Sequence, residues 1–176
     1  MPVAETFTST PLLLVVMGVS GSGKTTVAAQ LAGRIGLPFV DGDDLHPKSN
    51  VAKMHAGVPL DDDDRWPWLD SVAATLAAAA DGGGMVLACS ALKHAYRDRI
   101  RGGTAGLASF AFLDVSFEQI AQRLKTRVDH FMPPNLLQSQ FATLERPGGD
   151  EADVMTIPAD GKADDIVAEV TRRLGR

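Results

Sequence analysis

The sequence has a single cysteine, Cys89, among its 176 residues. One cysteine excludes an internal disulfide framework and is typical of proteins from a reducing compartment. Long hydrophobic runs are absent too, because the longest apolar stretches have the length of strands and fall far short of a membrane span. Residues 1–10 lack the basic start and the apolar core of a signal peptide. Together these absences predict a cytoplasmic protein that does not bind membranes.

Clusters of positive charge are also lacking. The 17 Lys and Arg residues are outnumbered by 22 Asp and Glu residues, which gives a net charge of -5, and no long basic run occurs. This balance argues against a general nucleic-acid-binding protein, although a few local cations suffice for a small anionic ligand. The cysteine and the four histidines do not cluster in the sequence, so we expect no zinc site.

The length of the chain favours one domain with a substantial core. Residues 1–11 contain Ser, Thr and Pro without hydrophobic periodicity, which predicts a flexible leader. We therefore place a single domain over residues 12–176. Within it, the aperiodic stretch at about 128–134 has charge, aromatic residues and two prolines, which is typical of a lid.

A phosphate-binding loop dominates what the sequence does contain. Residues 18–25 read GVSGSGKT and match the pattern GxxxxGK[ST] at every fixed position. Residues 12–17 before it form a buried-strand pattern, and residues 26–35 after it predict a helix. Glycines allow a tight loop whose N–H groups point inward, and the helix that follows adds the positive end of its dipole. The predicted nucleotide-binding residues are Gly18, Ser20, Gly21, Ser22, Gly23, Lys24, Thr25 and Thr26.

Two of these residues have specific expected roles. Lys24 is predicted to contact the β- and γ-phosphates, and the Thr25 hydroxyl to coordinate Mg²⁺. The motif leaves the reaction open, because transferases, hydrolases and switches all use it.

Further strands and helices alternate along the chain. Apolar runs predict four more strands, at residues 37–40, 85–89, 109–115 and 154–157. Helical patterns occur at residues 50–55, 61–80, 92–101, 117–127, 135–144 and 164–174. This alternation predicts an α/β, three-layer P-loop fold with a five-stranded parallel sheet and right-handed crossovers.

Two aspartates follow the second predicted strand. In an open parallel sheet, ligands bind beyond the carboxyl ends of the strands. Asp41 and Asp43 are two residues apart and therefore point the same way from an extended backbone. One carboxylate can hold Mg²⁺ through water, and the other can accept the proton of an attacking hydroxyl. The alternative is a polar turn capped by aspartate.

Basic residues follow the third and fourth strands. Lys93 and Arg97 are four apart on a predicted helix, where they could bind an anionic substrate or simply be solvated. Arg123 and Arg127 lie one turn apart before the predicted lid, where guanidinium groups match phosphate oxygens and stack on bases. The alternative is that cations are favoured at any helix C-terminus. His130, in the lid, is a further candidate ligand contact.

Two short matches to other nucleotide-binding motifs are coincidental. Residues 150–153 spell the helicase signature DEAD, but they precede their strand instead of following it. Residues 81–84 fit the DxxG motif of GTPase switches, yet they also precede a strand, and no guanine-reading NKxD or TKxD motif occurs. A nucleotide-dependent switch remains the alternative class, but a carboxylate pair placed for a hydroxyl favours a kinase.

Taken together, these motifs resemble the gluconokinase family of small P-loop kinases, which is related to shikimate kinases and nucleoside monophosphate kinases. The resemblance extends from about Leu12 to the last strand. It is carried by residues 17–24 (MGVSGSGK), 41–47 (DGDDLHP), 59–60 (PL), 62–65 (DDDR), 67–69 (PWL), 89–93 (CSALK), 96–98 (YRD), 140–141 (QF) and 143–145 (TLE).

The resemblance implies transfer of the γ-phosphoryl group of ATP, with Mg²⁺, to the 6-hydroxyl of D-gluconate, by a homodimeric enzyme. By analogy with shikimate kinases, Asp41 would serve Mg²⁺ and Asp43 the substrate hydroxyl. Arg65 and Lys93 would face the sugar acid, and His46 adds a short polar group for its hydroxyls. A different small acceptor, such as shikimate, is the alternative within the kinase class.

The predicted catalytic residues are Lys24, Asp43 and Arg127. The lid departs from the family pattern, because Val128 and Asp129 stand where Lys-Gly-like residues are expected before the histidine. We expect this departure to affect lid contacts and not the reaction.

Overall fold

Strand β1 lies at the centre of a five-stranded parallel sheet, in a computed structural model that describes residues 10–126 and 134–176. The order across the sheet is β2-β3-β1-β4-β5, and every neighbouring pair is parallel. The strands are β1 (Leu12–Met17), β2 (Phe39–Asp41), β3 (Gly84–Ala88), β4 (Ala108–Asp114) and β5 (Val154–Pro158). The prediction of a five-stranded parallel sheet in an α/β fold is confirmed.

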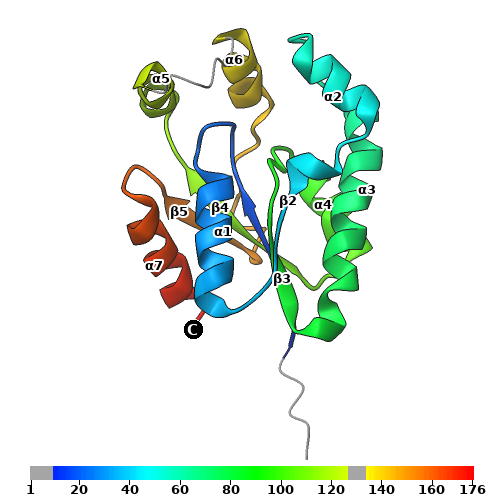
Figure 1. Ribbon diagram of the computed structural model, residues 1–176, viewed down its shortest axis with the longest axis vertical. Helices are drawn as coiled ribbons and strands as arrows, with labels where there is room; N and C mark the ends of the chain where they lie inside the picture. The colour runs from blue at the N-terminus through cyan, green and yellow to red at the C-terminus, as the bar shows by residue number, and fades with distance from the viewer. Residues whose placement is uncertain (1–9, 127–133) are drawn as a thin grey trace, which may run out of the picture.

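Helices cover both faces of this sheet and its carboxyl edge (Figure 1). The α-helices are α1 (Lys24–Ile35), α2 (Lys48–His55), α3 (Asp62–Ala78), α4 (His94–Gly103), α5 (Phe117–Thr126), α6 (Pro134–Thr143) and α7 (Ala163–Arg173). Two short 3-10 helices, η1 (Gly42–Leu45) and η2 (Ala80–Gly82), follow β2 and precede β3. At the top of Figure 1, α2, α5 and α6 gather at the edge of the sheet where the strands end.

The core consists of two hydrophobic clusters, one on each face of the sheet. Leu14 and Val16 of β1 pack into the cluster formed with α1 and α7. Leu13, Val15 and Met17 pack into the other cluster, formed with α3 and α4. Because successive side chains of a strand point to opposite faces, a strand buried on both sides has to be apolar throughout. This explains the unbroken apolar run before the phosphate-binding loop.

The observed boundaries differ from the predicted ones by one or two residues, and two of these differences matter for the site. Helix α1 begins at Lys24, so the Lys and Thr of the motif lie in its first turn. Helix α4 begins at His94, which leaves residues 89–93 as a loop in which Ala91 has a positive φ of 42°. The predicted lid and most of the predicted leader lie outside the described residues.

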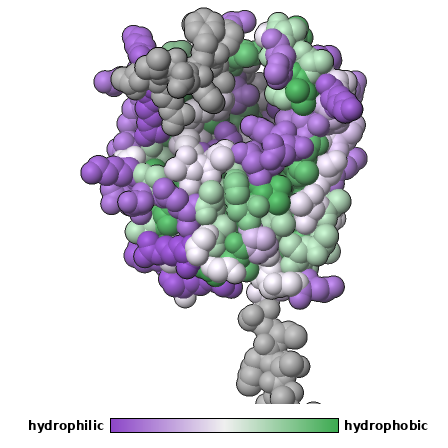
Figure 2. All heavy atoms as spheres, viewed as in Figure 1, coloured by the Kyte–Doolittle hydropathy of each residue, from purple (hydrophilic) through white to green (hydrophobic). Residues whose placement is uncertain are grey.

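The surface is mixed in character. Figure 2 shows hydrophilic side chains gathered on the side of α7, while hydrophobic and near-neutral residues lie toward the centre of the same face. No helix within residues 10–126 and 134–176 is long and apolar enough to cross a membrane.

Candidate active site

The phosphate-binding loop has the backbone conformation that an anion cradle requires. Gly18, Gly21 and Gly23 have φ angles of 150°, 81° and 94°, which L side chains rarely adopt. At Gly18 a Cβ atom would also lie 3.1 Å from the carbonyl oxygen of Leu113, so a larger residue would crowd the backbone of β4. Gly23 is the N-cap of α1, and no described side chain caps that helix. No capping side chain among the described residues therefore accepts from the N–H groups in the first turn of α1, which includes Thr25. These N–H groups point into the loop.

Lys24 lies across this loop. Its ammonium group donates to the carbonyl oxygen of Val19 at 3.1 Å. Desolvation lowers the pKa of Lys24, and the carboxylate of Asp43 is the largest influence that opposes this shift. Desolvation likewise raises the pKa of Asp43, against the opposing effect of Lys24. The predicted phosphate-binding cation and one predicted carboxylate are therefore electrostatic neighbours.

The other carboxylate is hydrogen-bonded to the loop helix. The hydroxyl of Thr25 donates to Oδ2 of Asp41 at 2.8 Å, and Oδ1 of Asp41 accepts the backbone N–H of Asp43 at 3.0 Å. These contacts place a hydroxyl and a carboxylate oxygen side by side at the edge of the cradle, which suits a hard cation such as Mg²⁺. Within the described part of the chain, no group of three or more His, Cys, Asp and Glu residues is placed to hold a metal ion. A cation here would therefore depend on phosphate oxygens and water for most of its ligands.

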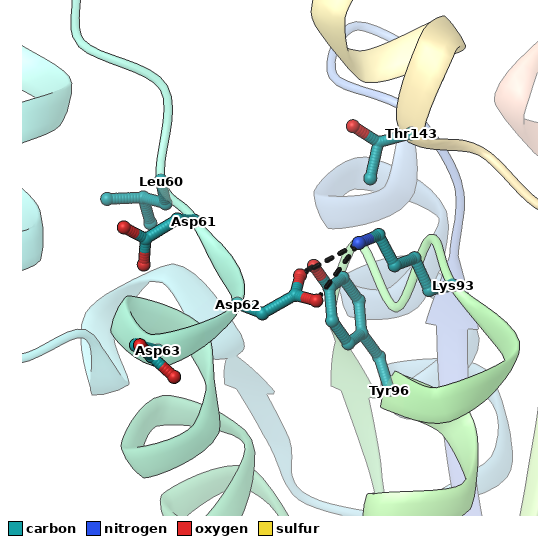
Figure 3. Close-up of a pocket in the computed structure, with 7 residues that line it drawn as sticks. All are labelled: Leu60, Asp61, Asp62, Asp63, Lys93, Tyr96 and Thr143. Carbon is teal, nitrogen blue, oxygen red and sulfur yellow. Dashed lines mark hydrogen bonds and ion pairs between the residues drawn. The ribbon is translucent and has the colours of Figure 1, made fainter.

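A pocket of about 460 Å³ lies between the start of α3, the start of α4 and the end of α6 (Figure 3). It is lined by Leu60, Asp61, Asp62, Asp63, Lys93, Tyr96 and Thr143. The ammonium of Lys93 donates to both carboxylate oxygens of Asp62, at 2.8 and 3.1 Å, and the Tyr96 hydroxyl donates to the same carboxylate. The hydrogen bonds from Lys93 and then Tyr96 lower the pKa of Asp62. The charge of Lys93 is therefore already compensated.

Arg65 lies beside this pocket and has no such counterion. Its side chain is buried, with Nε donating to the Leu60 carbonyl oxygen at 3.4 Å and the guanidinium 5.5 Å from the centre of the Tyr96 ring. No described carboxylate lies within ion-pair distance of it. His46 stacks on Trp68 with ring centres 4.1 Å apart, and desolvation followed by the charge of Arg65 lowers its pKa to about 4. His46 is therefore neutral near pH 7, and because its Nδ1 accepts from the side-chain nitrogen of Asn50 at 3.2 Å, its Nε2–H is left as a donor.

Known relatives match nearly the whole chain. The family model described as shikimate kinase matches residues 20–175. The gluconokinase of Gluconobacter oxydans is 48% identical over 163 residues, which cover 92% of this chain and 90% of the relative. The thermoresistant gluconokinase of Escherichia coli is 45% identical, with 89% of each chain covered. The chain belongs to the gluconokinase family.

The fold agrees with this membership. A crystal structure of a gluconokinase from Sinorhizobium meliloti matches with a TM-score of 0.87 and 44% identity, covering 94% of this chain and 93% of that one. The predicted resemblance to gluconokinases, and with it the predicted P-loop kinase fold, is confirmed.

The prediction that Arg97 binds substrate is wrong for this gluconokinase-family chain. Arg97 is fully buried and pairs through Nε and a terminal nitrogen with both carboxylate oxygens of Glu151, at 2.7 and 2.6 Å. Its remaining donors bind the backbone carbonyls of Ala91, Leu92 and Glu145. Because all these donors are engaged inside the protein, Arg97 cannot reach a ligand in the pocket. It instead holds together the loops that contain Ala91, Leu92 and Glu145.

Of the remaining predicted cations, Arg123 lies within the described residues. Arg123 on α5 donates to the carbonyl oxygen of Ala159, which directly follows β5, at 2.5 Å. Arg127 and His130 lie outside the described residues, so their predicted roles stay predictions.

Two contacts at this site were not predicted from the sequence. Gln140 on α6 accepts the backbone N–H of Ser20 in the cradle at 3.1 Å. Glu145, just after α6, accepts the backbone N–H of His94 at 2.7 Å and so caps the start of α4. Both residues lie in the segment 140–145 that carries part of the family resemblance, but no local pattern assigns them a contact more than 50 positions away. Spacing rules cover near neighbours only.

Proposed function

We propose that the protein transfers the γ-phosphoryl group of ATP to the 6-hydroxyl of D-gluconate, giving 6-phospho-D-gluconate and ADP. The observation that carries this proposal is the position of Asp43, which adjoins Lys24 of the cradle in a chain whose relatives are named gluconokinases. A raised pKa suits a proton acceptor, because the ideal base titrates closer to the working pH than a free carboxylate does.

The cradle residues would bind the nucleotide. N–H groups at the start of α1 would contact the phosphates, and Lys24 would exchange its bond to Val19 for one to the β- and γ-phosphates. The oxygens of Thr25 and Asp41 fit Mg²⁺, which when bound neutralises charge on the transferred phosphoryl group. Arg123 would lie near the base, and Arg127, if it acts as predicted, would stabilise charge on the transferred group.

The acceptor would bind between β2 and the pocket of Figure 3. Arg65 is the better partner for the gluconate carboxylate, because Lys93 already pairs with Asp62. The Lys93 and Asp62 pair, together with neutral His46, would donate to and accept from hydroxyl groups along the sugar chain. Asp43 would then take the proton of the terminal hydroxyl as it attacks the phosphorus atom.

Coupled measurement of ADP release over a panel of acceptors tests this function. We expect gluconate to be used with a far higher kcat/KM than shikimate or glycerate, because a site built for several hydroxyls loses partners with the wrong acceptor. Shikimate is the competitor of interest, since the matching family model carries that name. A comparable kcat/KM for shikimate would contradict the proposal.

Substitution of Arg65 tests the acceptor site directly. We expect Arg65→Ala to raise the KM for gluconate about 10- to 100-fold with a much smaller change in the KM for ATP, since a charge-assisted hydrogen bond to a carboxylate is lost. Arg34, an exposed residue near the end of α1, provides the control variant Arg34→Ala. A defect confined to the KM for ATP would show that Arg65 does not face the acceptor.

We further propose that the protein works in the cytoplasm as a homodimer. The single cysteine, Cys89, is buried and unpaired, which suits a reducing compartment. The dimer is an implication of the family resemblance. Light scattering coupled to gel filtration would detect it, and a mass near the 18.6 kDa of one chain at micromolar concentration would contradict it.

A further inference from the structure

One peptide unit of the cradle is held from both sides by side chains. The carbonyl oxygen of Val19 accepts a hydrogen bond from the ammonium of Lys24 at 3.1 Å. The N–H of Ser20, which belongs to the same peptide unit, donates to Oε1 of Gln140 at 3.1 Å. Because a peptide is planar, these two contacts together fix the direction in which its N–H and its carbonyl point.

Helix α6, which supplies Gln140, also reaches the acceptor pocket. Thr143, one turn further along the helix, lines the pocket above Lys93 in Figure 3. The chain after α6 remains attached there, since the N–H of Glu145 donates to the Leu92 carbonyl oxygen at 2.9 Å. One short helix therefore touches the phosphate cradle through one side chain and the acceptor pocket through another.

We propose that Gln140 is a positioning residue that orients the Val19–Ser20 peptide for phosphate binding and thereby couples nucleotide binding to acceptor binding. The inference rests on the proposed function, because it requires a phosphate in the cradle and a sugar acid in the pocket. Lys24 must leave Val19 when it binds phosphate, and Gln140 is then the side chain that still holds this peptide. That bond then connects the cradle to α6, and through α6 to Thr143 in the pocket.

Coupling of this kind is reciprocal and can be measured as a ratio of affinities. Calorimetry would give the affinity for gluconate with and without a non-hydrolysable ATP analogue, and the affinity for the analogue alone. The test variant is Gln140→Met, which keeps the length of the side chain but removes its acceptor. The matched control is Gln138→Met, since Gln138 is exposed on the same helix and makes no side-chain hydrogen bond to the described residues.

We expect Gln140→Met to weaken binding of the analogue about two- to tenfold, the usual worth of one hydrogen bond. Its affinity for gluconate alone should equal that of the wild type. The ratio of its gluconate affinities with and without the analogue should fall to about one, which means that the analogue no longer improves gluconate binding. Gln138→Met should retain both properties. The inference would be overturned if the analogue still improved gluconate binding by the wild-type factor in Gln140→Met. It would also be overturned if the analogue did not improve gluconate binding to the wild type.

A second variant covers the case in which Gln140→Met melts early. Gln140→Glu keeps an acceptor for the N–H of Ser20, so it should retain the gain in affinity for gluconate that the ATP analogue causes, although its negative charge weakens nucleotide binding. Loss of this gain in Gln140→Glu would contradict the inference. If wild type binds no gluconate, the proposed function fails, and nucleotide affinity alone decides the role of Gln140.

Discussion

At the scale of single residues, Lys24 connects the phosphate-binding loop to Asp43, the proposed proton acceptor. Its ammonium contacts the loop carbonyl of Val19, and its charge opposes the raised pKa of Asp43. We expect Lys24→Ala to fold normally, because the core does not use its charge, and to lose about 10²–10³-fold in kcat, the typical effect of one electrostatic contact in a transition state. Steady-state kinetics and a thermal melt would test both parts. Near-normal turnover by a well-folded variant would contradict the cradle assignment.

Asp41 and Asp43 should differ in their response to substitution. Asp43→Asn removes the proton acceptor, so kcat should fall with little change in nucleotide affinity, whereas Asp41→Asn should raise the Mg²⁺ concentration needed for half-maximal rate. Kinetics across a Mg²⁺ titration measure both effects. Identical Mg²⁺ dependence in the two variants would show that the roles are not divided.

The pH profile gives an independent check on the same pair. Asp43 must be ionised to accept a proton, and its pKa is raised, so kcat should fall as the pH decreases through a value above its ordinary 3.8. The charge of Asp41 contributes to that shift, so Asp41→Asn should move the acidic limb to lower pH. A limb that stays in place would show that another group limits the rate.

At the scale of elements, the first turn of α3 shows how a charged run can serve structure and site together. Asp61 is the N-cap and accepts the N–H of Asp64 at 2.9 Å, while the Asp64 carboxylate accepts the N–H of Asp61 at 3.0 Å. This is a reciprocal capping box, and it aims the next residue, Asp62, at Lys93. The sequence predicted a helix over residues 61–80 but not this contact across the pocket.

The cap gives a prediction for stability. Asp61→Ala should lower the free energy of unfolding by about 1 kcal/mol, whereas Asp61→Asn should cost only a few tenths because Asn is also a good N-cap. Urea denaturation of the two variants measures the difference. Equal losses would indicate that the charge of Asp61, and not its capping hydrogen bond, stabilises α3.

Strands and helices were predictable because their signals are local, and the same reasoning explains the error at Arg97. Five apolar runs bounded by turns give five strands. The spacing of Lys93 and Arg97 implies a shared face only inside a helix, but Lys93 is the N-cap of α4, with φ of −93° and ψ of 151°. Arg97 therefore points into the protein, toward Glu151, which lies 54 positions further along the chain. No pattern within a helix length could show that partner.

At the scale of the whole molecule, Arg97 and Glu151 join parts of the chain that the sheet alone does not connect. Arg97 binds the carbonyls of Leu92, just before α4, and of Glu145, just after α6, and Glu151 also pairs with Arg101 at 2.7 Å. Glu151 lies just before β5, so this buried pair ties the segment between α6 and β5 to α4. The ion pairs of Glu151 with Arg97 and Arg101 therefore connect the loops beside the pocket of Figure 3 to the edge strand β5.

This centre should make the protein sensitive to acid. The hydrogen bonds of Arg97 are the largest cause of the lowered pKa of Glu151, which falls from an ordinary 4.5 to about 2. A carboxylate with a lowered pKa stabilises the fold above its unfolded pKa, and this contribution, about 3 kcal/mol, is lost as the pH falls from about 4.5 toward 2. Urea denaturation at a series of pH values would show wild-type stability decreasing through that range.

Two variants isolate the contribution of the buried pair to this acid sensitivity. Glu151→Gln leaves Arg97 buried without a counterion, so it should lose about 3–5 kcal/mol at pH 7 and then depend less on pH in the acidic range. The hydrogen bonds of Arg172 and Arg173 also lower the pKa of Glu169, but this pairing lies on the surface of α7, where solvent screens the charges and little stability follows. Glu169→Gln should therefore keep the wild-type stability and its acid sensitivity. If the two variants behaved alike, the stability would reflect total charge and not the buried connection between α4 and β5.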